Sequence, residues 1–417
     1  MATRQPAKNG TRPRSAEEPP PAGGDALVAA MAASAIGGGI ARPLLGMQRV
    51  FSTLGSALAT GHCPHAWIFH GPSGIGKCTA AMRLAAVLVD PQSTSAERAT
   101  CSPLTDSRSA DLLRAGTHPD VHLIRADLAG SSADRELRDR KQVNIPIQLL
   151  REHMIGGTSS SGAPIEGPIF KSSVLGAGKV FIIDEAERLE TDGQNVLLKV
   201  LEEPPPGTVI VLVTSSLDRL LPTIRSRCQS LGFSPLGSEH MKQWLDMHLG
   251  EVTGTHRAFI EQYAAGSPGA AVTAVAMELQ ALHAKIVPMM DRLERGECPL
   301  ELSDVMNDFA SEAAEAAVKA NENASKEAAN RRAAGIVFSV IGAEVRRRMH
   351  AARSQPSRLR YWARVPMVIA DTERMLQANV NQKLALAEFV AAWAAIGSAA
   401  GSETGTRGAA SAGGQRA

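Results

Sequence analysis

The segment from Gly71 to Lys77 has the residue types and spacing most clearly suited to chemistry. It reads Gly-Pro-Ser-Gly-Ile-Gly-Lys and fits G-x-x-x-x-G-K, the pattern of a phosphate-binding loop between a strand and a helix. Glycines such as Gly74 and Gly76 let backbone N–H groups and the following helix N-terminus surround a phosphate chain. Lys77 would then reach the β- and γ-phosphates. The alternative is a glycine turn followed by a chance lysine, and the apolar run before it, AWIFH, argues against that.

The residue after the lysine departs from this pattern. A Ser or Thr hydroxyl usually stands there and binds Mg²⁺, whereas Cys78 offers a soft thiol that is a poor ligand for a hard cation. Thr79 comes one residue late and points about 100° away on a helix. We therefore expect weak or absent ATP and Mg²⁺ binding, with Cys78 either filling a loop that no longer binds metal or weakening a working site. Its place at a helix N-terminus beside Lys77 also predicts a lowered thiol pKa.

Further polar side chains follow two other apolar runs. Asp184 and Glu185 come after Lys179-Val-Phe-Ile-Ile, where one carboxylate would hold Mg²⁺ and the other would polarise an attacking water. Thr214 and Ser215 end the run from Val209, where a polar side chain would sense the γ-phosphate. Acidic turns at strand ends are common by chance, but the phosphate loop upstream favours a functional interpretation.

A sheet must hold these residues together. Apolar runs at 66–70, 121–124, 179–184 and 209–214 alternate with helical patterns such as 77–89 and 193–202. This alternation predicts an α/β phosphate-loop domain with a largely parallel sheet. The stretch 156–167 is expected to be a mobile loop. After about residue 233 the pattern is helical throughout, first in a small helical lid domain and then in an all-helical C-terminal domain.

The predicted organisation has five parts. They are a disordered N-terminal extension (1–40), the α/β domain (41–234), the lid (235–281), the larger helical domain (282–400) and a disordered tail (401–417).

Composition narrows the function classes. Of 417 residues, 44% are hydrophobic and 21% charged, which is ordinary for a globular protein with a core, and the net charge of +2 is too small to steer a polyanion to the whole chain. The arginine cluster 346–348 with Arg353 is interpreted as a solvated helix face rather than a DNA or partner contact. Five scattered cysteines indicate a reducing cytoplasm. No apolar run reaches eighteen residues, so no membrane contact is expected.

Several longer segments carry a resemblance to a known family. They are Leu45-Gly-Met-Gln48, His65–Pro72, Gly116-Thr-His-Pro-Asp120, Leu197–Thr208 and Leu220–Cys228. These segments resemble the clamp-loader branch of the AAA+ ATPases, the subunits of bacterial DNA polymerase III that load the sliding clamp. The resemblance covers about residues 41–280 well and the rest weakly, and Asn379–Leu386 is similar to the helical collar of these subunits.

The resemblance implies an AAA+ domain followed by a lid and a collar, and it gives Arg227 the central role. In this family the arginine of the Ser-Arg-Cys triplet faces the ATP of the neighbouring subunit and acts in trans as an arginine finger. A permanently charged, planar guanidinium suits that work. The alternative for Arg227 is a surface ion pair. The implied partners are gamma/tau and delta subunits in a pentameric ring, the sliding clamp, and primed DNA bound through the assembled complex.

Two branches of the family compete. Gamma/tau subunits hydrolyse ATP and carry a lid arginine in a G-S-x-R pattern, whereas this sequence has Gly269 at that place. Together with Cys78, this favours the delta-prime branch, a component of the polymerase holoenzyme whose own ATPase is weak or absent. A gamma/tau-type ATPase remains an alternative. So does a different AAA+ machine, such as a helicase loader or a recombination factor.

Zinc is not expected. Members of the family often carry a four-cysteine module before Gly-Thr-His-Pro-Asp, but Cys101 stands alone there, and a structural zinc ion needs four nitrogen or sulfur ligands.

Overall fold

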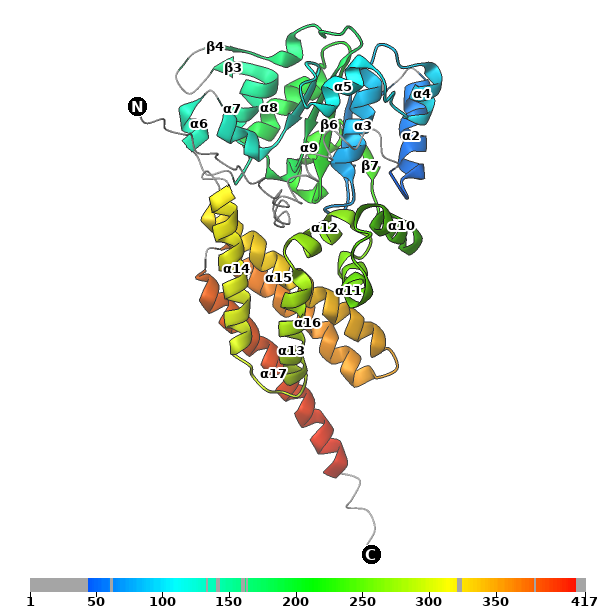
Figure 1. Cartoon of the computed structure of the whole chain (residues 1–417). Coiled ribbons are helices and arrows are strands. Elements are labelled where there is room, and N and C mark those ends of the chain that lie inside the picture. Colours follow the sequence, from blue (N-terminus) through cyan, green and yellow to red (C-terminus); the bar gives the residue numbers. More distant parts are fainter. Residues whose placement is uncertain are drawn as a thin grey trace, which may run out of the picture.

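The computed structural model has an α/β part above a helical part (Figure 1). It describes residues 44–409 apart from 61–62, 133, 140–142, 159–161, 163, 321–324 and 379, and within 398–409 it gives the helix backbone alone. The predicted N-terminal extension, 1–40, lies outside the described residues, as do 410–417.

A five-stranded parallel sheet forms the centre of the α/β part, in the order β2-β5-β6-β1-β7. The prediction of a parallel α/β sheet is confirmed. Sequence patterns missed the edge strand β7, which is short and mostly exposed. The strands are β1 (Ala66–His70), β2 (Val121–Ile124), β5 (Lys179–Ile183), β6 (Thr208–Thr214) and β7 (Gln229–Gly232).

The central strands are apolar because helices cover both of their faces. β5 and β6 are buried along their whole length. One core cluster packs α2 and α3 on one face, and another packs α7 and α8 on the opposite face. The helices of this part are α2 (Gln48–Ala59), α3 (Lys77–Val89), α4 (Ser95–Thr100), α5 (Arg108–Arg114), α6 (Arg135–Asp139), α7 (Ile147–Leu150), α8 (Thr191–Glu202) and α9 (Pro222–Arg225).

The stretch predicted as a mobile loop begins and ends in a small antiparallel pair, β3 (Gly156–Thr158) with β4 (Pro164–Glu166). Gly156 has a φ of 79° and lies so close to Gly167 that a Cβ would be 2.4 Å from the Gly167 nitrogen. Glycine therefore permits this pairing, which composition alone did not indicate.

From α10 onward the described chain contains helices only, as predicted. These are α10 (Ser238–His248), α11 (Gly254–Ala264), α12 (Pro268–Ala276), α13 (Leu279–Glu294), α14 (Glu301–Ala320), α15 (Lys326–Ala351), α16 (Pro356–Gln377) and α17 (Gln382–Ala409). The predicted boundary at 281/282 falls inside α13, and α17 continues to Ala409, into the predicted tail.

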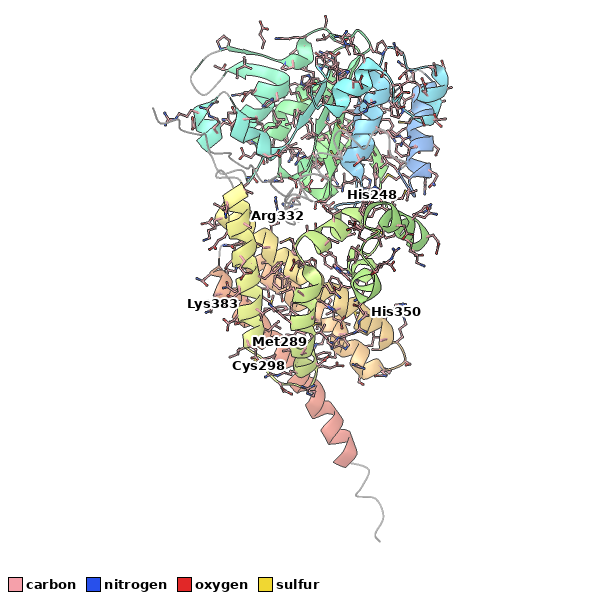
Figure 2. The ribbon with its side chains drawn as sticks, in the orientation of Figure 1. His248, Met289, Cys298, Arg332, His350 and Lys383 are labelled. Atoms are coloured by element: carbon pink, nitrogen blue, oxygen red, sulfur yellow. The ribbon has the colours of Figure 1, made fainter. Side chains whose placement is uncertain are left out.

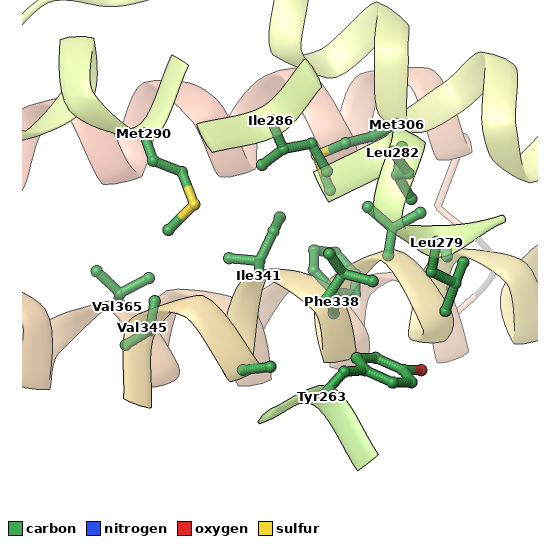
Figure 3. Packing of buried hydrophobic residues seen from close by; sticks show 14 of the residues in the cluster. Tyr263, Leu279, Leu282, Ile286, Met290, Met306, Phe338, Ile341, Val345 and Val365 are labelled. Carbon is green, nitrogen blue, oxygen red and sulfur yellow. The ribbon is translucent and has the colours of Figure 1, made fainter. Parts of the chain in front are cut away.

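One apolar cluster joins the helical part from Leu236 to Ile396. Figure 3 shows Tyr263 of α11 and Leu279, Leu282 and Ile286 of α13 packed near Phe338 and Ile341 of α15. Among the described residues no single helix is long and apolar enough to cross a membrane, although α12 and α13 pass that test as a pair bent by 85°.

Candidate functional site

The predicted phosphate loop lies where the sheet can present it. It follows β1, which pairs with both β6 and β7, and leads into α3 at Lys77. Lys77 is buried, and its Nζ donates to the carbonyl oxygens of Gly71 at 2.8 Å and Pro72 at 2.7 Å. Burial lowers the pKa of Lys77, while the nearby Glu187 and Asp184 carboxylates oppose that shift. The Lys77 side chain is thus held by hydrogen bonds to its own loop.

Cys78 and Asp184 contact each other beside this lysine. The Cys78 thiol is hydrogen-bonded to the Asp184 carboxylate at the end of β5. Desolvation, followed by the negative charge of Asp184, raises the pKa of Cys78 well above its ordinary value. The prediction of a lowered thiol pKa is therefore wrong, because burial and a carboxylate outweigh the helix N-terminus and Lys77. Burial also raises the pKa of Asp184.

Glu185, the second predicted carboxylate, is paired with a residue outside the phosphate loop. Glu185 is exposed and left-handed in backbone conformation, with φ 53°. Its carboxylate forms an ion pair with Arg188 in the following turn. Thr79, the nearest hydroxyl side chain after Lys77, is half-buried in the first turn of α3.

Glu187 is a site residue that sequence reasoning missed. Its carboxylate accepts the Ser215 backbone N–H at 3.3 Å and the Ser215 hydroxyl. Burial alone would raise the pKa of Glu187, but hydrogen bonds from Ser215 and Thr214 lower it. Thr214 is buried at the end of β6 and accepts the Ser216 N–H at 3.1 Å. The signal was present in the sequence as the third carboxylate of Asp-Glu-Ala-Glu.

The lid closes directly on the phosphate loop. The Gly269 N–H donates to the Gly74 carbonyl at 2.8 Å, and the Ser267 hydroxyl donates to the Ser73 carbonyl at 3.0 Å. A Cβ on Gly269 would lie 2.7 Å from the Gly74 Cα, closer than real Cβ atoms come. Gly74 has φ 74°, and a Cβ there would meet Ser267. We call this contact between the N-terminus of α12 and the loop the lid clasp.

Arg227 lies at the surface just beyond α9, away from the loop residues in sequence. Its guanidinium forms a 2.6 Å ion pair with Glu202 at the end of α8 and donates to the Thr223 carbonyl at 3.0 Å. The side chain remains 36% exposed. The structure thus brings Cys78, Asp184 and Glu187 near Lys77, with Ser215 bonded to Glu187, while Arg227 pairs with Glu202 instead.

The donor groups at the loop suit phosphate better than they suit a metal ion. Backbone amides lie before the N-terminus of α3, as a phosphate loop requires. The Lys77 ammonium group and the Gly74 carbonyl, however, are hydrogen-bonded to other groups of the protein. The Cys78 thiol donates a hydrogen bond to the Asp184 carboxylate. A Mg²⁺ ion at this position would meet a sulfur atom where it prefers an oxygen ligand. No group of three or more potential ligands for a metal ion occurs within the described residues. The prediction that zinc is absent stays a prediction.

Comparison with known proteins finds similarity over the part of the chain that holds this site. Residues 46–237, which include every candidate residue from Gly71 to Arg227, match the family described as DNA polymerase III, delta subunit. DNA polymerase III subunit delta-prime of Bacillus subtilis is 32% identical over 188 residues, 45% of this chain and 47% of the relative. Subunit gamma/tau of Mycobacterium bovis is 30% identical over 205 residues, 48% of this chain and 30% of the relative.

Among solved structures, a gamma subunit-related protein of DNA polymerase III from Thermotoga maritima is matched with 16% identity and a TM-score of 0.36, over 85% of this chain and all of that chain. The chain spans about half the length, or less, of the curated relatives that it matches. Over residues 46–237 the chain is similar to subunits of DNA polymerase III, of both the delta-prime and the gamma/tau kinds.

Proposed function

We propose that the protein is a delta-prime-like clamp-loader subunit that supplies Arg227 in trans to ATP held by a neighbouring subunit. In this proposal it sits with gamma/tau and delta subunits in a pentameric ring that opens the sliding clamp and places it on primed DNA. Its own nucleotide site is degenerate, and its contribution is to position one arginine and to support the ring.

The surface position of Arg227 carries the proposal. An arginine finger must leave its own chain to reach a neighbour's phosphate, and the Arg227 side chain is 36% exposed at the end of a short helix. An ion pair with Glu202 holds it, together with hydrogen bonds that it donates to the Thr223 carbonyl and the Ser226 hydroxyl. Exposed ion pairs of this kind contribute only about 0–1 kcal/mol, so a phosphate could replace Glu202 at small cost.

The loop supports a subunit that does not hydrolyse ATP itself. Cys78 replaces the hydroxyl ligand of Mg²⁺, Glu185 is paired with Arg188, and the lid clasp joins Gly269 to Gly74. A lid arginine at position 269 could not occupy this arrangement, because even a Cβ would be too close to Gly74.

The test is the Arg227→Ala substitution in the reconstituted ring, followed by its DNA-stimulated ATPase. Arginine fingers of other phosphoryl-transfer enzymes contribute roughly 10³-fold or more to turnover, so the ATP site facing Arg227 should become almost silent while the ring still assembles. Arg225→Ala is the matched control, since Arg225 lies two residues away and pairs with Asp218 instead. An unchanged ATPase in the Arg227→Ala ring would refute the role in trans.

A gamma/tau-type ATPase is the second candidate, favoured by the retained Lys77 and by the 30% identity with gamma/tau of Mycobacterium bovis. Titration of the isolated protein with ATP separates the two candidates. Tight binding that depends on Mg²⁺ supports the ATPase, and its absence supports the delta-prime-like role.

A further inference from the structure

The hairpin of α15 and α16 concentrates positive charge that the rest of the chain lacks. Residues 345–370 contain seven arginines and no Asp or Glu, whereas the remaining residues hold 37 Lys and Arg against 42 Asp and Glu. Although the net charge of the whole chain is close to zero, this one region is strongly basic. The turn of this hairpin lies at the lower right of Figure 1, away from the α/β part, and Figure 2 labels His350 near it.

Three of these arginines have structural partners inside the helical part. Arg348 is buried, and it pairs with Glu344 at 2.7 Å and with Asp291 at 2.7 Å. Its guanidinium also lies 4.8 Å from the centre of the Trp362 ring. Arg347 pairs with Glu344, and Arg358 pairs with Glu294. The expectation that 346–348 form a solvated face is thus wrong for Arg348.

The other four arginines, Arg346, Arg353, Arg360 and Arg364, are exposed and form no ion pair within the described residues. We call them the basic tip. With a rise of 1.5 Å per residue, each lies within about 12 Å of the turn along its helix. That is close to the screening length of about 10 Å at 0.1 M salt, so these charges act on an approaching ligand together.

We propose that the basic tip binds the phosphate backbone of DNA without reading its sequence. Arginine presents a planar fork that matches phosphate oxygens in pairs. Phosphate contacts of this kind supply affinity and orientation but no base recognition.

The exposed residues around the turn argue against a membrane surface as the ligand. They are Ser354, Gln355, Pro356 and Ser357, which are small or polar and give no apolar side chain to insert among lipids. The choice of DNA over an acidic protein rests on the proposed function. The uncompensated charge of the tip does not depend on it.

The test measures binding of the full-length protein to a fluorescent primer–template DNA by anisotropy between 50 and 200 mM salt. Four phosphate contacts account for a roughly 10²-fold loss of affinity over that range. The R346Q/R353Q/R360Q/R364Q variant should therefore reduce the slope of log K against log salt by about 3 to 4. The R360Q/R364Q variant, which changes α16 alone, should reduce it by about 2.

A second quadruple variant controls for net charge. R49Q/R108Q/K285Q/K319Q removes the same four charges from exposed positions elsewhere and should leave the slope nearly unchanged. The proposal is overturned if the slope of both tip variants equals that of the wild type, or if the control reduces it as much. It is also overturned if the tip variants lose binding to poly-glutamate or to anionic vesicles while DNA binding persists.

This experiment and the ATPase assay can fail separately. If the tip variants reduce the salt slope while the ATPase of the Arg227→Ala ring is unchanged, the results would support DNA binding by the basic tip and refute the role of Arg227.

Discussion

At the scale of single residues, Cys78 decides most of the chemistry of the phosphate loop. Its sulfur replaces a metal-binding hydroxyl and donates a hydrogen bond to Asp184. The same carboxylate that would hold a metal ion is thus engaged by a thiol. Two predictions isolate the effects of this residue on metal binding and on reactivity.

The Cys78→Ser substitution should strengthen Mg²⁺-dependent ATP binding. A hydroxyl is the hard oxygen ligand that Mg²⁺ prefers. We expect this contact to contribute about 1.5 kcal/mol, which corresponds to a roughly tenfold increase in affinity. Calorimetric titration with and without Mg²⁺ measures the change, and Cys78→Ala serves as the control. If the serine variant binds no more tightly than the alanine variant, the thiol is not what weakens the site.

The Cys78 thiol should react slowly with iodoacetamide at pH 7. Only the thiolate is a good nucleophile, and desolvation together with Asp184 raises the pKa of this thiol well above its ordinary value. Alkylation should therefore accelerate only as the pH rises far beyond about 8.5. Mass spectrometry can follow Cys78 alongside the exposed Cys298. Equal rates for the two cysteines at pH 7 would contradict a half-buried thiol that is hydrogen-bonded to Asp184.

At the scale of elements, the lid clasp connects α12 to the phosphate loop through two glycines. The clasp allows no side chain at position 269, because a Cβ there would overlap Gly74. The N-terminus of α12 thus lies in direct contact with the backbone of the predicted phosphate loop.

The Gly269→Ala substitution should open the clasp. The added methyl group must displace α12 or the loop, which breaks the 2.8 Å hydrogen bond from Gly269 to Gly74. Hydrogen exchange of residues 73–76 should accelerate by tenfold or more, the equivalent of about 1.4 kcal/mol. Gly237→Ala is the control, since a Cβ at Gly237 meets nothing within 4 Å. Equal exchange in both variants would show that the loop does not depend on the clasp.

A buried ion network joins α13, α15 and α16. Glu344 is fully buried and accepts hydrogen bonds from Arg347 at 2.5 Å and from Arg348 at 2.7 Å, with His283 at 3.3 Å. Desolvation alone would raise the pKa of Glu344, but these partners hold it well below its ordinary value. The network therefore requires a charged carboxylate.

The Glu344→Gln substitution should lower the free energy of unfolding at pH 7 by about 1–3 kcal/mol, because buried Arg348 loses one of its carboxylate partners and keeps only Asp291 and Glu294. A carboxyl whose folded-state pKa is depressed stabilises the fold above its unfolded pKa of about 4.3, and this stabilisation is lost as the pH falls toward the folded value. Urea unfolding should thus show the two proteins converging in acid. Exposed Glu312 gives the control, Glu312→Gln, and a similar loss in both would contradict the network.

At the scale of the whole molecule, the lid and the collar share one core. The apolar cluster runs from Leu236 to Ile396, and the Tyr263 hydroxyl of α11 lies 2.8 Å from the Ser339 hydroxyl of α15. We therefore expect the helices of the lid to be stabilised by the collar, although the two are separate in sequence.

The Phe338→Ala substitution tests this coupling. Phe338 is buried and meets Phe389 of α17 edge to face, so its loss should cost about 3–5 kcal/mol. Hydrogen exchange should accelerate in α11 of the lid as well as in α17. Phe170→Ala is the control, because Phe170 is 64% exposed. Acceleration confined to α15 and α17 would show two independent cores.

Local patterns predicted much of this architecture. The boundaries of β1, β2 and α3 agree with the sequence patterns because each is a short apolar or helical run between glycine-rich or polar turns. The edge strand β7 was missed because its Gln-Ser-Leu-Gly sequence buries one side chain only. Its pairing with β1, about 160 residues earlier in the chain, supplies what the composition of β7 does not indicate.

The sequence by itself predicted the phosphate loop, the strand that precedes it and the helix that follows it, and it carries the similarity of residues 46–237 to DNA polymerase III subunits. Those features depend on residue types at short, fixed spacing. Only the tertiary structure decided which groups meet. It placed Asp184 against Cys78, Glu187 against Ser215, Gly269 against Gly74 and Glu202 against Arg227. Charge, burial and pKa at a site depend on contacts between distant segments, and spacing along the chain does not specify them.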